Sequence, residues 1–356
     1  MKNAAPSLLL CLSICVIWSP MAGPADAAVP QFGTADTFDI MTWNLESFPV
    51  NGQTTVNKVA EVVEDLDVDV IALQEIVSAS DFDSLVAMLD GWDGYRATSS
   101  YDNLNAAYLW NTATVTLDRF SEIFQSNPNF PRHPLVMKFE WGGVDVEAIN
   151  LHLRCCDTGE DARRAASEAL QGYLVNQMSL PGERNFIVLG DFNDKIDDPV
   201  ADNVFQNFVD DDEHFLFATM ELCGDSSQWS WPHWPDRGII DHILLTADLF
   251  DEYDSTGFIE TQRLDDYLGS TWYFDNVTDH RPVAMRIELF PAPDCTDEDG
   301  DGYAVEGGEC GAVDCDDQQS EVYPGHAEVP GNGLDDDCDG RVDEPCFIGS
   351  LTNALM

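Results

Sequence analysis

Several apolar segments of this chain end in side chains that can bind a metal ion or move a proton. The apolar run Ile187–Leu189 leads directly into Gly190-Asp-Phe-Asn193, so a buried strand delivers Asp191 and Asn193 to the edge of a sheet. A carboxylate and a carboxamide are costly there unless they are hydrogen-bonded, bound to a metal or used in chemistry. Other apolar segments carry or end in similar groups, namely Asn44, Glu75, His152, Asp241, Asp279 and His280.

These residue types suit the hydrolysis of a phosphate ester with the help of a divalent cation. Ligand sites of layered α/β folds lie at strand ends, so we expect these side chains to converge in one cleft. Oxygen ligands from Glu75, Asn44 and Asp279, without a thiolate, favour Mg²⁺, Mn²⁺ or Ca²⁺ over zinc. With Mg²⁺ or Mn²⁺ bound, such a site would polarise a phosphoryl oxygen and stabilise the developing charge.

The remaining residues suit the proton transfers of that reaction. Asp191, helped by Asn193, would orient and deprotonate the attacking water. His280 would hydrogen-bond to the phosphate or the attacking group, with Asp241 holding its ring in the useful tautomer, and His152 would support the leaving oxygen. Taken singly, each of these groups is as easily a turn, cap or core residue. Their joint occurrence favours a site.

The segments that position these residues predict a layered α/β fold. Apolar residues at helical spacing in Thr54–Leu66 lie between apolar strands at 38–46 and 68–75, which indicates a parallel strand–helix–strand opening. The clearest helix is predicted at Thr158–Gln177, with Thr158 as its N-cap and Asp161 in its first turn. A short helix is predicted at 82–89. Further strands are predicted at 94–99, 106–110, 115–120, 135–141, 144–152, 185–191, 238–245 and after His280.

Six short motifs resemble, in order along the chain, those of the endonuclease/exonuclease/phosphatase superfamily, the fold of DNase I. They are Thr42-Trp-Asn-Leu-Glu46, Leu73-Gln-Glu75, Asn150-Leu-His152, Gly190-Asp-Phe-Asn193, Ile240-Asp-His242 and Thr278-Asp-His-Arg-Pro-Val283. The resemblance covers about residues 36–290. It implies a four-layer α/β sandwich of two mixed β-sheets flanked by helices, and it says little about the substrate.

The resemblance also implies roles for single residues. Asn44 and Glu75 would bind the catalytic metal, and Asp279 would complete or adjoin that site. Asp191 and Asn193 would position the nucleophile. His280 and Asp241 would form the catalytic pair. His152 stands where DNase-like members carry a histidine, which favours a nuclease among the metal-dependent phosphoric ester hydrolases.

The charge of the chain limits how it can meet a polyanion. Its 356 residues include 66 acidic and 16 basic ones, for a formal net charge of -50, which repels polyanions over a Debye length of about 8 Å. A duplex nuclease gains much of its affinity from several phosphate contacts. Few basic residues lie near the motifs: Arg96, Arg132, Arg154, Arg163, Arg164, Arg237 and Arg281. Nucleotides, phospholipid headgroups and other phosphate esters therefore remain open as substrates beside nucleic acid.

Three tryptophans precede the Asp241 motif, at Trp229, Trp231 and Trp234. They would stack on a base, enter a lipid interface, or simply pack within their loop. The sequence favours none of these alternatives.

Residues 1–28 predict a secretory signal peptide. An apolar run from Leu8 to Trp18 follows Lys2, and Ala25-Asp-Ala27 forms a small-x-small cleavage site. The run is short for a membrane-spanning helix, so a membrane anchor is the lesser alternative. We therefore expect a secreted, periplasmic or cell-surface protein, monomeric and without a transmembrane helix, whose eight later cysteines favour disulfides.

An acidic, cysteine-rich module is predicted at 294–346, after a break in apolar periodicity near Phe290. From Asp294 to Glu344 the chain has eighteen acidic residues and one basic residue, Arg341. Without compensating cations such a segment would stay disordered. Two stretches have the acid spacing and glycine of an EF-hand-type loop, although no regular EF-hand is expected. Their acids are Asp297, Asp299 and Asp301, then Asp335, Asp337, Asp339 and Asp343.

This module resembles calcium-binding repeat modules appended to secreted proteins of myxobacteria and their relatives. The resemblance implies Ca²⁺ at the aspartates just named, and the alternative is a solvated acidic tail. Four cysteines would staple the module: Cys295, Cys310, Cys315 and Cys338. A further expectation is that Cys155 or Cys156 pairs with Cys223.

Three hypotheses for function follow from these observations. The first is a secreted Mg²⁺-dependent phosphodiesterase, with an endo- or exonuclease favoured. The second is a phospholipase C, sphingomyelinase-like or phosphatase activity of the same fold. The third is a calcium-dependent adhesion or matrix protein with an inactive hydrolase scaffold. A scaffold need not retain Asp191 with Asn193 and Asp279 with His280, so an enzyme is favoured.

Overall fold

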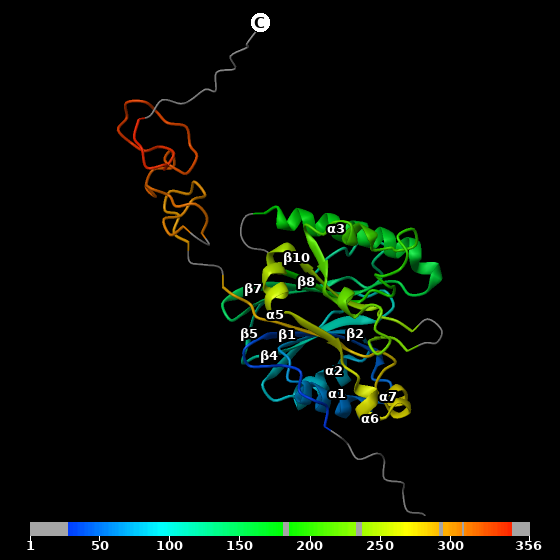
Figure 1. Cartoon of the computed structure of the whole chain (residues 1–356). Coiled ribbons are helices and arrows are strands. Elements are labelled where there is room, and N and C mark those ends of the chain that lie inside the picture. Colours follow the sequence, from blue (N-terminus) through cyan, green and yellow to red (C-terminus); the bar gives the residue numbers. More distant parts are fainter. Residues whose placement is uncertain (1–27, 181–184, 233–236, 292–294, 308–309, 344–356) are drawn as a thin grey trace, which may run out of the picture. The chain divides into compact units, whose positions relative to one another are not determined.

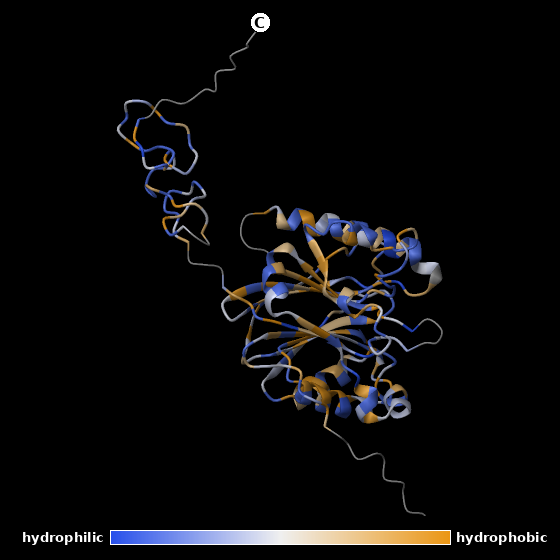
Figure 2. Ribbon diagram, in the orientation of Figure 1, coloured by the Kyte–Doolittle hydropathy of each residue, from blue (hydrophilic) through white to orange (hydrophobic). Residues whose placement is uncertain are grey.

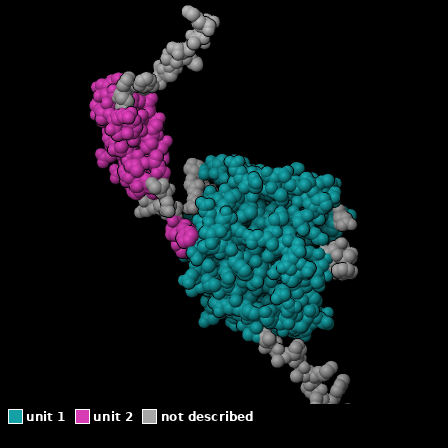
Figure 3. Space-filling view, in the orientation of Figure 1, with its two compact units in different colours: residues 1–141, 145–289 teal, residues 142–144, 290–356 magenta. Residues whose placement is uncertain are grey.

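The computed structural model of the chain describes residues 28–180, 185–232, 237–291, 295–307 and 310–343. The predicted signal peptide, apart from Ala28, lies outside the described residues, as does Trp234. The chain divides into two compact units (Figure 3). The large unit comprises residues 1–141 and 145–289, and the small unit comprises residues 142–144 and 290–356.

The first sheet of the large unit has six strands in the order β11-β12-β1-β2-β4-β3. Their bounds are Phe38–Phe48 for β1, Val70–Ile76 for β2, Trp92–Arg96 for β3, Asn105–Asn111 for β4, Phe258–Thr261 for β11 and Val283–Ile287 for β12. Strand β1 runs parallel to β2 and antiparallel to β12. The predicted parallel strand–helix–strand opening is therefore confirmed.

The second sheet also has six strands, in the order β5-β6-β7-β8-β10-β9. Their bounds are Val115–Glu122 for β5, Leu135–Trp141 for β6, Val144–His152 for β7, Asn185–Asp191 for β8, Phe215–Phe217 for β9 and Asp241–Thr246 for β10. Strand β8 is parallel to β7 and antiparallel to β10. Both sheets are mixed, as expected.

Helices cover the outer faces of the two sheets (Figure 1). Their bounds are Gln53–Leu66 for α1, Ala79–Met88 for α2, Glu160–Met178 for α3, Gln206–Val209 for α4, Phe250–Thr256 for α5, Leu264–Leu268 for α6 and Ser270–Asn276 for α7. Helices α1, α2, α6 and α7 share a core with the first sheet, and α3 and α4 share one with the second. The result is the predicted four-layer sandwich.

The period-2 alternation of the strands decides which residues face the helices and which face the other sheet. In β1, Met41, Trp43 and Leu45 pack into the core with the helices, so Thr42 and Asn44 point between the sheets. Figure 2 shows apolar residues concentrated on the strands, whereas the helices carry both polar and apolar residues.

Two buried carboxamides join the sheets between these layers. Gln74 Nε2 donates to Asn150 Oδ1 at 2.8 Å. Asn150 Nδ2 in turn donates to the carbonyls of Leu73 and Ala107, both at 2.9 Å. Because β7 carries Asn150 while β2 and β4 carry its partners, this network fixes the position of one sheet over the other.

Two predictions were wrong. Helix α3 begins at Glu160 with Gly159 as its N-cap, and Thr158 lies in a 3-10 turn that precedes it, so Thr158 does not cap the helix. The thiols of Cys155, Cys156 and Cys223 are free. The expected pairing fails because the first two lie on an exposed loop along one cavity, whereas Cys223 donates to the Thr219 carbonyl and lines another.

The small unit consists of loops. Within residues 295–307 and 310–343 the structure has no helix and only one isolated bridge, between Ala304 and Val313. Disulfides Cys295–Cys310 and Cys315–Cys338 close it, which confirms the predicted staples.

Among the helices of the described residues, none has the length and apolar character needed to cross a bilayer.

Candidate active site

Strand register brings three of the expected site residues together. His152 at the end of β7 is the Cα partner of Asp191 at the end of β8, and Asp241 at the start of β10 pairs with Asp191 from the other side. Neighbours of His152 and Asp191 in the sequence, Leu151 and Val188 among them, pack against the helices, so alternation turns both site side chains into the space between the sheets. All three are buried.

Two residues reach the site through an unusual backbone conformation. Glu75 has a φ of 62° at an irregularity in the pairing of β2, and Asn193 has a φ of 56° just after β8. In a regular strand Glu75 would point to the helix side, as Leu73 does, so the irregularity redirects it. Side chains in this left-handed region are strained and cluster at functional sites.

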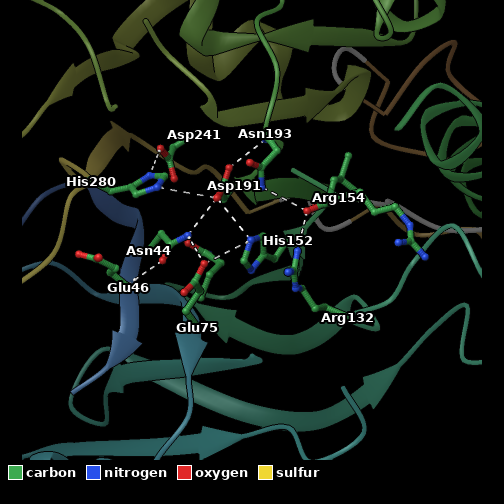
Figure 4. A network of polar contacts seen from close by, with 12 residues as sticks. Asn44, Glu46, Glu75, Arg132, His152, Arg154, Asp191, Asn193, Asp241 and His280 are labelled. Carbon is green, nitrogen blue, oxygen red and sulfur yellow. Dashed lines mark hydrogen bonds and ion pairs between the residues drawn. The ribbon is translucent and has the colours of Figure 1, made fainter. Parts of the chain in front are cut away.

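Asp191 lies at the centre of the constellation (Figure 4). Its Oδ2 accepts a hydrogen bond from Asn44 Nδ2 at 2.9 Å, and its Oδ1 accepts one from the backbone N–H of Asn193 at 2.9 Å. The Nε2 atoms of His152 and His280 lie 3.5 Å and 4.0 Å from Oδ2. The structure thus brings together residues from both sheets.

His280 and Asp241 form a buried pair, with Nδ1 and Oδ2 separated by 2.8 Å. Tyr273 donates its hydroxyl to the His280 carbonyl at 2.6 Å, and Ser230 Oγ accepts the Asp241 backbone N–H at 3.1 Å. These contacts hold the pair from both sides. No sequence motif points to Tyr273 or Ser230 as a supporting residue.

Glu75 lies on the opposite side of Asp191. Its Oε1 is 3.4 Å from Asn44 Nδ2 and 3.7 Å from His152 Nε2, and its Oε2 accepts the Ser47 backbone N–H at 2.9 Å. The amide nitrogen of Asn44, rather than its oxygen, therefore faces Glu75 and Asp191. Its oxygen accepts the backbone N–H of Glu46 at 3.0 Å.

Asp279 lies on the His280 side of the site, with Oδ1 at 3.8 Å from His280 Nε2. Its backbone N–H donates to Glu46 Oε2 at 3.1 Å, and its Oδ2 accepts from Trp231 Nε1 at 3.4 Å. Sequence reasoning missed Glu46 as a site residue. The available signal was its position two residues after Asn44, within the same motif.

Burial and mutual repulsion shift the protonation of the site. Burial, together with the charge of Asp241, raises the pKa of Asp191 to about 7, although His280 and the Asn44 hydrogen bond act in the opposite direction. Burial would lower the pKa of His280, but the charge and hydrogen bond of Asp241 outweigh it and raise that pKa to about 10. Burial, Arg132 and His280 hold the pKa of His152 well below its usual range.

The donor set fits a divalent cation. The site has five carboxylates and only two imidazoles. The carboxylates belong to Glu46, Glu75, Asp191, Asp241 and Asp279. Burial and the charges of Asp279 and Glu75 raise the pKa of Glu46, which shows how poorly the negative charge is compensated within the protein. Carboxylate oxygens are the ligands that a hard cation prefers. Among the described residues of the site, the ligand atoms that all lie within 4.8 Å of one another are those of Asp191, Asp241 and His280, and this group includes neither Glu75 nor Asp279.

His242 follows Asp241 in the sequence motif but has a structural role. It is buried, with Nδ1 at 3.0 Å from Thr219 Oγ1 and Nε2 at 2.9 Å from the Asp194 carbonyl. Burial lowers its pKa to about 4, so the ring is neutral at physiological pH.

The arginines near the site are engaged by the protein itself. Arg281 forms two hydrogen bonds to Asp265 and stacks on Trp229, and Arg163 pairs with Asp194. Four others donate hydrogen bonds to backbone carbonyls: Arg96 to Ile76 and Val77, Arg132 to Leu153, Arg154 to Pro128, and Arg164 to Asn203. Arg237 lies over the ring of Trp229. This part of the structure therefore shows no ready-made phosphate-binding surface for a long duplex.

The first acidic loop of the small unit folds around its own aspartates. Asp297 accepts the backbone N–H groups of Gly300 and Gly302, and oxygens of Asp297, Asp299 and Asp317 lie within 4.8 Å of one another. The structure thus adds Asp317 to the aspartates expected in this loop.

The second loop repeats part of this arrangement. Asp335 accepts the N–H groups of Asp339 and Gly340, and oxygens of Asp335, Asp337 and Glu328 lie within 4.8 Å of one another. Asp343, by contrast, accepts N–H groups from Gly331 and Gly333. Asp339 accepts the Arg341 N–H, so both of these aspartates, like Asp335, also support the backbone of the loop.

A two-sheet sandwich with a carboxylate–imidazole site at its strand ends defines a hydrolase of the phosphoesterase class. The model of the Endonuclease/Exonuclease/phosphatase family matches residues 41–280, and the chain belongs to this family. Members of the family use divalent metal ions, and the predominance of carboxylates at the site agrees with that. In the small unit, the Cu-binding MopE model, which describes a metal-binding motif, matches residues 314–344.

Several solved structures share the fold. D. rerio TDP2 in complex with a single-strand DNA product is 15% identical with a TM-score of 0.54, covering 71% of this chain and 99% of that chain. The human nocturnin catalytic domain with bound sulfate is 16% identical with a TM-score of 0.54, covering 72% of this chain and 95% of that chain. A Bacteroides thetaiotaomicron mannosyl-6-phosphatase is 16% identical with a TM-score of 0.52, covering 71% and 100%. A search of curated proteins gave no match.

Proposed function

We propose that this chain is an exported, divalent-cation-dependent phosphodiesterase with nuclease-like specificity. The observation that carries the proposal is the position of Asp191, within 4.0 Å of two imidazoles and hydrogen-bonded to Asn44 from the opposite sheet. A carboxylate held in this way can orient a water molecule, and the imidazoles can hydrogen-bond to a phosphate.

Glu75 would hold the cation, with Asn44 and Asp279 completing or adjoining its site. Mg²⁺ or Mn²⁺ would polarise a phosphoryl oxygen and neutralise part of the carboxylate charge. Turning the Asn44 amide would offer its oxygen to a cation held beside Glu75, at the loss of its present hydrogen bonds to Asp191 and to the Glu46 N–H.

Asp191 would accept the proton of the attacking water. Its pKa of about 7 is well matched to a base that works near neutral pH. The backbone N–H of Asn193 fixes one of its oxygens at 2.9 Å, which leaves the other directed at the centre of the site. The Asn193 side chain is itself held by a 3.2 Å hydrogen bond to the Leu153 carbonyl.

The two histidines would act as hydrogen-bond donors to the phosphate. His280, with a pKa of about 10, carries a positive charge at neutral pH, and Asp241 fixes its ring through Nδ1. Its Nε2–H then points toward Asp191 and the substrate. His152 is neutral and would support the leaving oxygen from the other side.

A cavity next to these residues suits a nucleobase. It has a volume of about 400 Å³ and is lined by Asn193, Lys195, Trp231, Ile240 and the loop of Cys155 and Cys156. Trp231 lines this cavity and also donates its Nε1–H to Asp279 Oδ2 at 3.4 Å, which connects the cavity to the catalytic residues. Stacking on an indole is tolerant of base identity, as a nuclease of low sequence preference requires.

Export and cation binding by the small unit complete the proposal. The signal-peptide sequence at 1–28 and two disulfides in the small unit favour an oxidising, extracellular setting. The aspartates of the two acidic loops, 297–301 and 335–343, would bind Ca²⁺ because their side chains offer only hard oxygen ligands. The proposed enzyme acts as a monomer.

A phosphatase or a phospholipase C of the same fold is the second candidate. It is favoured by the engagement of the nearby arginines in internal contacts, because a small phosphate ester needs fewer phosphate contacts than a polynucleotide. A mannosyl-6-phosphatase is among the solved structures of similar fold, which supports this candidate. An adhesion or matrix protein with an inactive scaffold would leave the Asp191–His280 geometry without a purpose.

The test is hydrolysis by the full chain of single-stranded DNA, RNA, dinucleotides, sphingomyelin and sugar phosphates, with Mg²⁺ and with chelator. The proposal expects cleavage of the nucleotide diesters, lost with chelator and lost in Asp191→Asn. The matched control is Asp251→Asn, an exposed aspartate on α5. Turnover of the monoesters or sphingomyelin alone would select the second candidate, and chelator-resistant activity would contradict the proposal.

A further inference from the structure

A third carboxylate cluster in the small unit joins residues from two segments. Oxygens of Asp299, Asp301 and Asp314 lie within 4.8 Å of one another. Asp299 and Asp301 belong to the first acidic loop, whereas Asp314 follows the Cys295–Cys310 disulfide and precedes Cys315. The loop spacing therefore accounts for two members of the cluster but not for the third.

Each of these carboxylates uses one oxygen to fold its own turn. Oδ1 of Asp299 accepts the Asp301 N–H at 3.2 Å, Oδ1 of Asp301 accepts the Tyr303 N–H at 3.0 Å, and Oδ1 of Asp314 accepts the Asp316 N–H at 3.0 Å. Within the described residues, the Oδ2 atom of each is buried and lacks a hydrogen-bond partner. Asp314 is only 3% exposed.

Three buried, unpaired carboxylate oxygens that face one another are costly without a cation. Asp299 also belongs to the cluster of Asp297 and Asp317, so the negative charge extends further. The only arginine or lysine between 294 and 346, Arg341, pairs with Asp339 in the second loop. No basic side chain of this unit is therefore placed to compensate the first loop.

We infer that Asp314 completes a Ca²⁺ site with Asp299 and Asp301, and that Asp297 and Asp317 contribute to the same site or adjoin it. Ligands that are all carboxylate oxygens favour a hard cation over copper or zinc, and their origin in two irregular segments suits the flexible coordination of Ca²⁺ better than the strict octahedron of Mg²⁺. The inference extends the Ca²⁺ binding proposed above for the acidic loops.

This site would make Ca²⁺ a structural link within the small unit. The ion would tie the 297–301 loop to the segment that carries Asp314, in addition to the Cys295–Cys310 disulfide. Both segments would then become ordered together when Ca²⁺ binds, rather than the loop alone.

Hydrogen–deuterium exchange of the full chain, with and without Ca²⁺ and read by mass spectrometry, tests the inference because it localises the effect. In the wild type we expect Ca²⁺ to protect 297–303 and 313–318 over the same range of Ca²⁺ concentration. In Asp314→Asn, protection of both segments should require at least about tenfold more Ca²⁺, while 335–343 responds as in the wild type. Glu321→Gln, which changes an exposed carboxylate of the same unit, should respond as the wild type does in every segment.

The outcomes separate this inference from the wider proposal. If residues 297–303 of the Asp314→Asn variant become protected at the same Ca²⁺ concentration as in the wild type, Asp314 is not a ligand. The inference then fails, although the loops bind Ca²⁺. If no segment of the wild type responds, both fail. Intact masses without reductant show whether both disulfides have formed, and a recovery of protection at high Ca²⁺ shows that the variant has folded.

Discussion

The carboxamide of Asn44 donates a 2.9 Å hydrogen bond to the carboxylate of Asp191, a residue 147 positions later in the chain and in the other sheet. The site is therefore built across the two sheets, and its geometry depends on their relative position. Changes in the layer that joins the sheets should affect the site even where they touch none of its residues.

Asn150 is the residue that joins the sheets most directly. Asn150→Ala removes two donated hydrogen bonds and one accepted bond from a fully buried position, which leaves the Leu73 and Ala107 carbonyls and Gln74 without that partner. We expect the free energy of unfolding to fall by at least about 2 kcal/mol, measured by urea denaturation. Asn176→Ala, at an exposed position on α3, should change it by less than about 0.5 kcal/mol. Equal effects of the two substitutions would contradict this role.

Asp241 should act through His280. His280→Ala should lower kcat by about 10² to 10⁴-fold, and Asp241→Asn should lower it by a smaller factor because the ring loses its orientation. The double variant should be no slower than His280→Ala when rates are compared well above the pKa of Asp191, where the effect of Asp241 on that pKa no longer matters and Asp241 acts through the ring. Additive losses would mean that Asp241 acts on the reaction independently.

The pH dependence of the rate should report the protonation of Asp191 and His280. Asp191 must be ionised to accept a proton, so the rate should rise with pH through its pKa, near 7 or lower once a cation is bound. His280 must keep its proton, so the rate should fall as the pH passes about 10. Asp241 raises both of these pKa values, and Asp241→Asn should therefore move both limbs of the kcat profile to lower pH. A shift of either limb to higher pH would contradict the assignment.

A substitution of Trp231 should distinguish a nuclease, which binds a nucleobase, from an enzyme whose substrate carries no nucleobase. Trp231→Ala should raise KM for a dinucleotide about tenfold or more, since stacking contributes about 1–3 kcal/mol per base. KM for glycerophosphodiesters, which carry no base, should stay unchanged. Trp231→Phe keeps a ring but loses the N–H to Asp279, and should retain most of the affinity for the dinucleotide. An equal loss on both substrates would assign Trp231 to the support of Asp279.

Elements with a clear local pattern of apolar residues could be predicted from the sequence. The apolar runs that end at Asn44, His152 and Asp191 are strands in the structure, and the stripe of α1 is buried as expected. Alternation along those strands is enough to place their polar ends between the sheets. The fold class and the parallel opening could therefore be predicted.

Contacts between distant residues could not be predicted in the same way. Helices α5, α6 and α7 are short, and their apolar patterns cover too few turns to be recognised. The role of Glu46 depends on the backbone of Asp279, and that of Asp314 on the folding of a separate loop. The cysteine pairing failed for the same reason, because spacing in sequence does not reveal which cavity a thiol lines.

The central claim is that Glu75 holds the cation while Asp191 serves the attacking water. A Mg²⁺ titration of phosphodiester hydrolysis by the wild type, Glu75→Gln and Asp191→Asn tests it most directly. The account predicts that Glu75→Gln needs at least about tenfold more Mg²⁺ for half-maximal rate, and that Asp191→Asn stays slow at every Mg²⁺ concentration. Wild-type rates for Asp191→Asn, or an unchanged Mg²⁺ requirement for Glu75→Gln, would contradict it.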